Sequence, residues 1–356
     1  MTNGQDKRWE AAVRLGITMG DPLGIGPEVV VKALAAWAAR REEPAVRWVV
    51  FGDAPRLEAV RAGLAGTLEW VVVADPADVD PSAPVVVVAG PSVDEPWGRV
   101  SAAAGRAAYE YIRVAVAEAM AGRLAGVVTA PIHKEAIHLA GIQEPGHTEI
   151  LQKLTGAHAV AMMLVGGGLR VSHVSTHVSL AEALARVTPE RIRAVTGMTL
   201  EALPRFGIAA PRVAVAGLNP HNGEHGLFGD TEDRVIRPAV EAMQAEGWPV
   251  VGPIPADTIF VRARSGEFDA VVALYHDQGH IPVKLLAFDE AVNLTLGLPI
   301  IRTSVDHGTG FDIAGRGVAR AESMLAAMRV AAHLASRATR GAEAARTDDR
   351  DRRERT

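Results

Sequence analysis

Short runs rich in valine and isoleucine alternate with longer segments rich in alanine and leucine, and this alternation restricts the fold of the chain more than any other feature. The apolar runs do not alternate with polar residues, which is typical of strands that are buried on both faces. The order of expected strands and helices predicts an α/β fold with a mostly parallel sheet core. The expected strands include Leu15–Met19, Trp48–Gly52, Glu69–Val73, Val85–Ala89, Gly126–Thr129, Val213–Leu218, Ala270–Tyr275 and Ile300–Thr303. The expected helices are Pro27–Trp37, Ala102–Ala121, Thr231–Glu246 and Ala319–Ala335.

The length of 356 residues is enough for two lobes around sizeable cores. We expect the folded part to extend over residues 13–336. Residues 1–12 and 337–356 are charged and lack apolar periodicity, and we expect them to be disordered tails.

Charge and composition exclude several functional classes. A net charge of -5 argues against general affinity for nucleic acid or for anionic membranes. The absence of cysteine excludes disulfides, thiolate nucleophiles and cysteine-bound zinc, so any transition metal must be held by His, Asp or Glu. The apolar runs are too short to span a bilayer, and the polar N-terminus does not resemble a signal peptide. We therefore expect a cytoplasmic protein.

Three histidines directly follow expected strands: His177, His221 and His276. Ligands of parallel α/β sheets bind at the carboxyl ends of the strands, so these imidazoles could meet on one metal ion and leave positions open for a substrate. For any one of these histidines alone, a packed or hydrogen-bonded structural residue is the more common case. Asp277 and Gln278 adjoin the third histidine and add polar groups there.

The segment Gly146-His-Thr-Glu149 is expected to be a loop that opens onto a helix N-terminus. Backbone N–H groups and the helix dipole favour an anion at such a position. The alternative is that His147 or Thr148 simply caps the helix.

Lys284 is one of only five lysines and stands in a segment, Asp277–Phe288, that can form a helix. Its apolar neighbours could partly desolvate the amine and make it a proton donor or acceptor near neutral pH. The alternative is a lysine whose stem is buried while its amine reaches solvent.

A glycine-rich segment, residues 306–317, precedes the last expected helix, and its glycines would allow the backbone to approach a pyrophosphate closely. The earlier segment Gly24-Ile-Gly-Pro-Glu28 also follows a strand, but it lacks the G-x-G-x-x-G spacing because position 29 is valine. We assign no cofactor to this earlier segment and expect a tight turn and a helix start there.

Together these segments resemble the PdxA family, the 4-hydroxythreonine-4-phosphate dehydrogenases, from about Arg14 to about Ala335. The resemblance is carried by the segments Ile17–Glu28, Thr129–Lys134, Gly146–Glu149, Gly217–Glu224, Pro255–Thr258, Tyr275–Gly279 and Asn293–Thr309. It implies a two-lobed fold like that of isocitrate and isopropylmalate dehydrogenases, with one lobe discontinuous in sequence and the cofactor bound outside the usual Rossmann fingerprint.

The resemblance also implies roles for individual residues and a homodimer with the site at its interface. The divalent-metal ligands (zinc, cobalt, manganese or magnesium) would be His177, His221 and His276, the last supplied across the dimer interface. The substrate would be held by His147, Thr148, Lys284, Asn293 and Arg302. NAD would lie along Asp306, Gly308, Thr309 and Asp312, and the acidic residues placed near the chemistry would be Asp257 and Asp277.

The implied reaction is NAD-dependent oxidation and decarboxylation of 4-(phosphooxy)-L-threonine to 3-amino-2-oxopropyl phosphate, a step of pyridoxine 5'-phosphate synthesis, with Lys284 as the base. One departure points to an alternative substrate. The form Gly279-His-Ile-Pro-Val-Lys284 resembles a second branch, which acts on D-threonate or D-erythronate 4-phosphate and gives dihydroxyacetone phosphate. Alternatives from other classes are a non-redox phosphate acyltransferase of related fold and a catalytically silent nucleotide-binding module.

Overall fold

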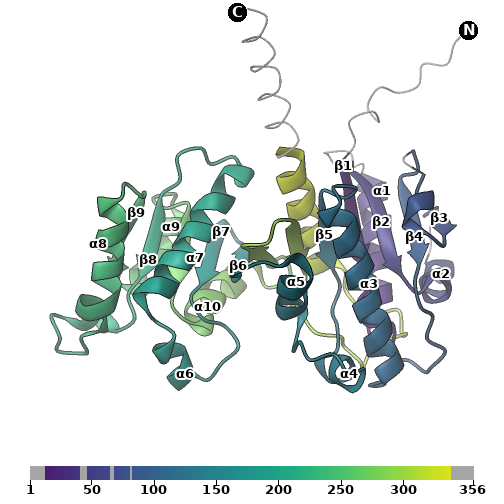
Figure 1. Cartoon of the computed structure of the whole chain (residues 1–356), viewed down its shortest axis with the longest axis horizontal. Helices are drawn as coiled ribbons and strands as arrows, with labels where there is room; N and C mark the ends of the chain where they lie inside the picture. Colours follow the sequence, from purple (N-terminus) through teal and green to yellow (C-terminus); the bar gives the residue numbers. More distant parts are fainter. Residues whose placement is uncertain (1–12, 41–45, 65–67, 81, 338–356) are drawn as a thin grey trace, which may run out of the picture. The chain divides into compact units, whose positions relative to one another are not determined.

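The computed structural model describes residues 13–40, 46–64, 68–80 and 82–337 (Figure 1). The chain divides into two compact units: unit 1 is Met1–Gly156 with Pro299–Thr356, and unit 2 is Ala157–Leu298. The expected tails, residues 1–12 and 337–356, lie outside the described residues except for residue 337, which is still helical. In the described ranges no helix is long and apolar enough to cross a membrane.

Unit 1 contains six parallel strands in the order β3-β4-β2-β1-β5-β12. Their bounds are β1 Val13–Thr18, β2 Val46–Gly52, β3 Val71–Val73, β4 Val85–Ala89, β5 Gly126–Thr129 and β12 Ile301–Ser304. The helices are α1 Gly26–Arg40, α2 Ala54–Ala62, α3 Ala102–Met120, α4 Lys134–Leu139, α5 His147–Thr155 and a helix over residues 322–337. The strand order reverses between β1 and β5, which is where open α/β sheets bind ligands.

Unit 2 contains six strands in the order β11-β6-β7-β10-β8-β9. The strands are β6 Ala161–Gly166, β7 Leu169–His173, β8 Val213–Ala216, β9 Val250–Ile254, β10 Ala270–Ala273 and β11 Val292–Leu296. The pairs β11–β6 and β6–β7 are antiparallel, whereas β7, β10, β8 and β9 pair in parallel. The helices are α6 Leu180–Ala185, α7 Pro189–Ala202, α8 Arg237–Ala245, α9 Ala256–Arg264 and α10 His276–Ala287.

The mostly parallel α/β class predicted from the sequence is confirmed, and each expected strand is present within a few residues of its predicted bounds. Residues of β10 and β8 are fully buried because helices α7 and α9 pack against both strands. That burial explains why apolar runs without alternation identified these strands. The expected helix Thr231–Glu246 begins with a π-helical turn, Glu232–Ile236, and continues as α8.

Candidate active site

The three strand-following histidines lie at one edge of the sheet of unit 2. Strands β7, β10 and β8 are adjacent and parallel, so their carboxyl ends point the same way. His177 follows β7, His276 begins α10 directly after β10, and His221 lies in a short turn, Pro220–Gly223, after β8. His177 and His221 are exposed and His276 is half-buried, so all three rings are open to a ligand.

His177 and His276 come together, with ring centroids 5.4 Å apart. Imidazoles that share a tetrahedral zinc ion, with Zn–N bonds of about 2.0–2.1 Å, have ring centroids roughly 5 Å apart. Nδ1 of His276 lies 2.7 Å from Oδ1 of Asp277. A carboxylate only accepts, so Nδ1–H donates and Nε2 keeps the lone pair that a metal ion needs.

The structure places the third expected ligand, His221, in ring contact with Phe228, at a centroid distance of 6.4 Å. Among the residues that the structure describes, no three His, Asp or Glu side chains form a group that could hold a metal ion by itself. The donor chemistry of His177 and His276 nevertheless fits a divalent cation, because two imidazoles stand at a suitable spacing and one has its tautomer fixed by a carboxylate.

The loop that carries His221 is held by Glu232, a residue that the sequence analysis did not single out. Glu232 is fully buried, and its carboxylate accepts hydrogen bonds from the backbone N–H groups of Leu218 and Asn219, at 2.7 and 2.6 Å, and from Nδ2 of Asn219 at 2.9 Å. His221 itself adopts a left-handed conformation with φ 51°. Such a strained residue persists only where its surroundings fix the backbone, and Glu232 provides that fixation.

We expect Glu232→Gln to lower the free energy of unfolding by about 1–3 kcal/mol, because the glutamine amide would present a donor to groups that are themselves donors. The same change should weaken metal binding through displacement of the His221 loop. Urea unfolding and zinc titration of the metal-free protein measure the two effects. The control is Glu241→Gln at an exposed position of α8; equal behaviour of the two variants would contradict the role given to Glu232.

The other expected residues of unit 2 lie on three different elements. Lys284 is half-buried on α10, and its Nζ lies 5.8 Å from the ring centroid of Phe288. Asn293 is on β11, and its Oδ1 is buried without a hydrogen-bond partner among the described residues. Asp257 is exposed in the first turn of α9, after β9, and Asp277 is exposed beside His276.

The substrate residues expected in unit 1 are His147 and Thr148 at the start of α5 and the nearby Arg302. The N-cap of α5 is Gly146, which makes no side-chain hydrogen bond, so neither His147 nor Thr148 caps the helix. Nη2 of the buried Arg302 donates to Oγ1 of Thr129 at 2.7 Å. Burial and the nearby charge of Arg302 lower the pKa of His147 well below its usual value, and burial lowers the pKa of Arg302 to about 9.

This group of residues suits an oxyanion. Nε2 of His147 is buried without a hydrogen-bond partner among the described residues. The N–H groups of the first turn of α5 receive no side-chain cap, and Arg302 adds a positive charge that can pair with two oxygens. A phosphate or carboxylate is the kind of ligand that such donors bind.

The segment expected to bind NAD follows β12 in unit 1, beside the point where the strand order reverses. Asp306 is half-buried, Thr309 is nearly buried, and Gly308 and Asp312 are exposed. A Cβ on Gly308 would meet no atom within 4 Å, so the backbone there is open to a close approach.

The N-terminal glycine segment, to which the sequence analysis assigned no cofactor, supports this NAD segment. The N–H of Ile25 donates to the carbonyl of Thr309 at 2.8 Å, and a Cβ on Gly24 would lie 2.9 Å from the same oxygen. His133 stacks on Phe311 with ring centroids 4.6 Å apart. Glycine at position 24 is therefore required by close packing of two loops.

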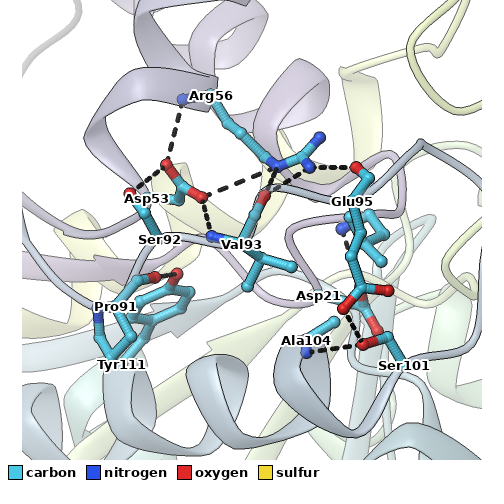
Figure 2. A network of polar contacts seen from close by, with 11 residues as sticks. Asp21, Asp53, Arg56, Pro91, Ser92, Val93, Glu95, Ser101, Ala104 and Tyr111 are labelled. Atoms are coloured by element: carbon cyan, nitrogen blue, oxygen red, sulfur yellow. Dashed lines mark hydrogen bonds and ion pairs between the residues drawn. The ribbon is translucent and has the colours of Figure 1, made fainter.

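A further loop is tied to the same region by Arg56 of α2 (Figure 2). The Arg56 guanidinium donates to the carbonyls of Val93 and Glu95 and lies 4.6 Å from the centre of the Trp97 ring. The carboxylate of Asp53, which caps α2, accepts from the N–H of Val93 at 2.8 Å. These bonds fix the loop that follows β4.

Comparison with known proteins agrees with this arrangement. The family model described as pyridoxal phosphate biosynthetic protein PdxA matches residues 45–331. The D-threonate 4-phosphate dehydrogenase of Cupriavidus necator is 48% identical over 328 residues, covering 91% of this chain and 97% of the relative. The 4-hydroxythreonine-4-phosphate dehydrogenase of Beijerinckia indica is 47% identical over 324 residues, covering 90% and 94%. The crystal structure of 4-hydroxythreonine-4-phosphate dehydrogenase from Klebsiella pneumoniae matches with a TM-score of 0.82 and 45% identity, covering 91% and 100%.

The fold and these relatives therefore define an α/β enzyme of the dehydrogenase class that acts on a CH–OH group. The chain belongs to the PdxA family. The resemblance seen in the sequence is confirmed, and the acyltransferase and silent-module alternatives receive no support from these relatives.

Proposed function

We propose that the chain catalyses the NAD-dependent and metal-dependent oxidative decarboxylation of D-threonate 4-phosphate or D-erythronate 4-phosphate to dihydroxyacetone phosphate. The observation that carries this choice of substrate is His280. It is buried on α10 with its ring stacked on His276, in the sequence form that resembles the sugar-acid branch. Relatives named for D-threonate 4-phosphate, from Cupriavidus necator and Pectobacterium atrosepticum, are 48% and 46% identical to the chain.

The residues of unit 1 supply an anion site and a cofactor segment. His147, Arg302 and the first turn of α5 would bind the phosphate or the carboxylate of the substrate, since they present donors and positive charge without a side-chain cap. Residues 306–312 would hold NAD where the backbone is open at Gly308. The supporting general rule is that open α/β sheets bind ligands where the strand order reverses.

The residues of unit 2 supply the metal ligands and the base. His177 and His221 would hold one divalent ion together with His276, which the family resemblance assigns to the other protomer of a homodimer, and Asp277 would orient His276 through Nδ1. When bound, the metal ion and NAD supply a Lewis acid at the C3 oxygen and a hydride acceptor for C3. Lys284 would take the proton of the C3 hydroxyl, and Asn293 would offer its partnerless buried carbonyl to a donor of the substrate. After oxidation the C1–C2 bond breaks, CO₂ leaves, and C2 takes up a proton.

The test is NADH formation at 340 nm with D-threonate 4-phosphate and 4-(phosphooxy)-L-threonine offered in parallel, first with zinc, cobalt, manganese or magnesium and then with a chelator. We expect turnover of the sugar acid, loss of turnover with the chelator, and dihydroxyacetone phosphate as product. Failure of both substrates with every metal and with either nicotinamide cofactor would overturn the proposal.

The second candidate is 4-(phosphooxy)-L-threonine, the substrate first expected from the sequence. It is favoured by the relatives from Beijerinckia indica and Klebsiella pneumoniae, which are named for 4-hydroxythreonine 4-phosphate at 47% and 45% identity. Turnover of the amino acid alone in the same assay would establish this candidate and remove the first.

We also propose that the chain is a homodimer, and the exposed face of α10 supports this. Ile281, Leu285 and Phe288 are 56%, 81% and 74% exposed and follow each other at helical spacing. An exposed apolar stripe on a helix that also carries His276 and Lys284 suits contact with a second copy.

The double variant Leu285→Glu/Phe288→Glu should therefore be a monomer, because a carboxylate cannot be buried unpaired in an apolar interface. Light scattering during size-exclusion chromatography measures the mass in solution. The control is Val261→Glu, which changes an apolar side chain on α9 that is 71% exposed. A dimer of unchanged affinity in the double variant would exclude this face as the interface.

A further inference from the structure

A row of four imidazoles runs through unit 2, from the buried His173 of β7 to the exposed His177. His173 and His280 have ring centroids 4.6 Å apart, His280 and His276 stack at 3.7 Å with planes 12° apart, and His276 lies 5.4 Å from His177. His173 is 0% and His280 4% exposed, so the inner half of the row is inside the protein. The outer half consists of two of the proposed metal ligands.

The protons of the inner pair can be assigned from their partners. Nδ1 of His173 lies 3.3 Å from the backbone carbonyl of Met162, which only accepts, so this nitrogen carries the hydrogen. Burial lowers the pKa of His173 to about 3, so the ring is neutral and its Nε2 is an acceptor. Nδ1 of His280 lies 3.1 Å from that Nε2 and 3.1 Å from the carbonyl oxygen of His276. With two acceptors facing it, Nδ1 of His280 is the protonated nitrogen.

This assignment fixes the orientation of the His280 ring. A flipped ring would direct a carbon atom at both acceptors and leave the buried Nε2 of His173 without its donor. Helix α10 comes close enough to β7 for this bond only because residue 279 is glycine, since a Cβ there would lie 2.3 Å from Nε2 of His173. The His173–His280 pair is therefore a rigid support inside the unit.

The His173–His280 pair contacts the ring of His276 through the His280 ring. One face of that ring is covered by the His280 ring, and its Nδ1 edge is held by Asp277. A face and an edge together define the plane of the imidazole, and hence the direction in which its Nε2 points.

We propose that His280, fixed by His173, is a positioning residue that sets the ring plane of His276 for metal binding. This inference rests on the proposed function, because it assumes that His276 binds the metal ion. It gives His280 a role in the strength of metal binding, in addition to its use above as a marker of the sugar-acid branch.

Three variants separate the two contacts of His280. His280→Phe keeps a ring that can stack on His276 but has no donor for His173. His280→Asn keeps a side-chain N–H donor near the position of Nδ1 but has no ring. His280→Ala removes both contacts, and His158→Ala, at an exposed histidine of the same unit, is the control.

Metal affinity is measured on the full-length metal-free protein by calorimetry with Zn²⁺ and by the visible absorption of Co²⁺. We expect His280→Ala to bind about 10- to 100-fold more weakly than the unmodified protein, with an altered Co²⁺ spectrum. The metal affinities of His280→Phe and His280→Asn should lie between those of His280→Ala and the unmodified protein, and the affinity of the control should match that of the unmodified protein. Should His280→Ala not fold, the order of affinities among the phenylalanine variant, the asparagine variant and the unmodified protein decides the question.

A merely structural role gives a different result. In that case the variants would melt at a lower temperature but bind Zn²⁺ and Co²⁺ within about twofold of the unmodified protein, and the inference would be overturned. If the unmodified protein binds metal and forms NADH, this outcome leaves the proposed function standing. If the unmodified protein binds no divalent metal at all, the proposed function fails at its metal site and the role of His280 fails with it.

Discussion

The His177→Ala variant is expected to lose about 10³-fold in kcat/KM and most of its divalent metal. A Lewis-acid metal contributes several kcal/mol to stabilisation of developing charge, and each 1.4 kcal/mol corresponds to about tenfold in rate. His177 lies 5.4 Å from His276 and is exposed, so its removal deletes a ligand without opening a cavity in the core. Its loss should therefore act on metal binding and leave the fold intact.

The measurement combines NADH formation with the metal content of the purified protein. The control is His138→Ala, which removes an exposed histidine from α4 in unit 1. The control should keep full activity and metal content, and both variants should unfold at nearly the same temperature as the unmodified protein. If His177→Ala retained its metal and turned over within twofold of the control, His177 could not be a ligand.

Most of the strands that the sequence predicted are buried on both faces, because such burial produces an uninterrupted apolar run. Strand β3 is the exception, since Val71 and Val72 are about half exposed. The bounds of four other strands were not predicted, for separate reasons, although a strand was expected before His177. The hairpin of β6 and β7 carried a signal in Gly166-Gly-Gly168, but the runs on either side mix methionine, arginine and serine with aliphatic residues. Strand β9 contains glycine and proline, and β11 contains asparagine and threonine, which weaken any apolar pattern.

The residues of the candidate site were predictable where a side chain that can bind a ligand comes directly after a strand. His177, His221 and His276 each come directly after a strand, and parallel strands bring their carboxyl ends to one edge. The residues that hold this edge in place were not predictable. The carboxylate of Glu232 accepts hydrogen bonds from the backbone of Leu218 and Asn219, which come earlier in the chain. Glu232 also begins a π-helical turn, and sequence periodicity does not distinguish such a turn from an α-helix.

The His173–His280 pair shows the same limit of sequence patterns. The two residues are 107 positions apart, and their hydrogen bond depends on the packing of α10 against β7. Nothing in the sequence indicates that a histidine in an apolar strand and a histidine in a helix lie close together in the folded protein. Sequence patterns therefore identify groups that could contact a ligand, whereas the supporting contacts depend on tertiary packing.

Asp21 is a second group whose importance appears only in the structure. It lies just before the N-terminal glycine segment Gly24–Glu28 and is 0% exposed; its Oδ1 accepts from the N–H of Leu23 at 2.9 Å. Its Oδ2 is buried and has no hydrogen-bond partner among the described residues, although the charges of His133 and of Arg56 act on it. Figure 2 shows Asp21 and Arg56. Burial raises the pKa of Asp21 to about 6, against the lowering effects of Leu23, His133 and Arg56.

The sign of the resulting pH dependence follows from this raised pKa. The folded protein holds the proton of Asp21 more tightly than the unfolded chain, in which the pKa of the carboxyl is the ordinary 3.8. The free energy of unfolding therefore decreases as the pH rises from about 4 to about 6, and the loss stays constant above that range. A shift of about two pKa units corresponds to about 3 kcal/mol.

Asp21→Asn should accordingly be more stable than the unmodified protein by up to about 3 kcal/mol at pH 8, because the amide keeps an acceptor for Leu23 and carries no charge. The advantage should shrink as the pH falls through 6. Urea unfolding of both proteins between pH 4.5 and 8 measures the difference, in which the titration of all other groups cancels. Asp94→Asn, at an exposed carboxyl in the nearby loop, is the control and should show no such trend.

A difference between Asp21→Asn and the unmodified protein that did not change with pH would show that Asp21 is not the group that titrates. The expected result would mean that this loop contains a carboxylate that lowers stability at neutral pH. Such a cost is typical of positions that serve function, because an apolar or amide side chain would be the more stable choice there. Asp21 lies two residues before the segment Leu23–Ile25 that packs on Thr309, so activity of the stabilised variant should be measured with NAD varied. A rise in KM for NAD together with the gain in stability would locate that function in the cofactor segment.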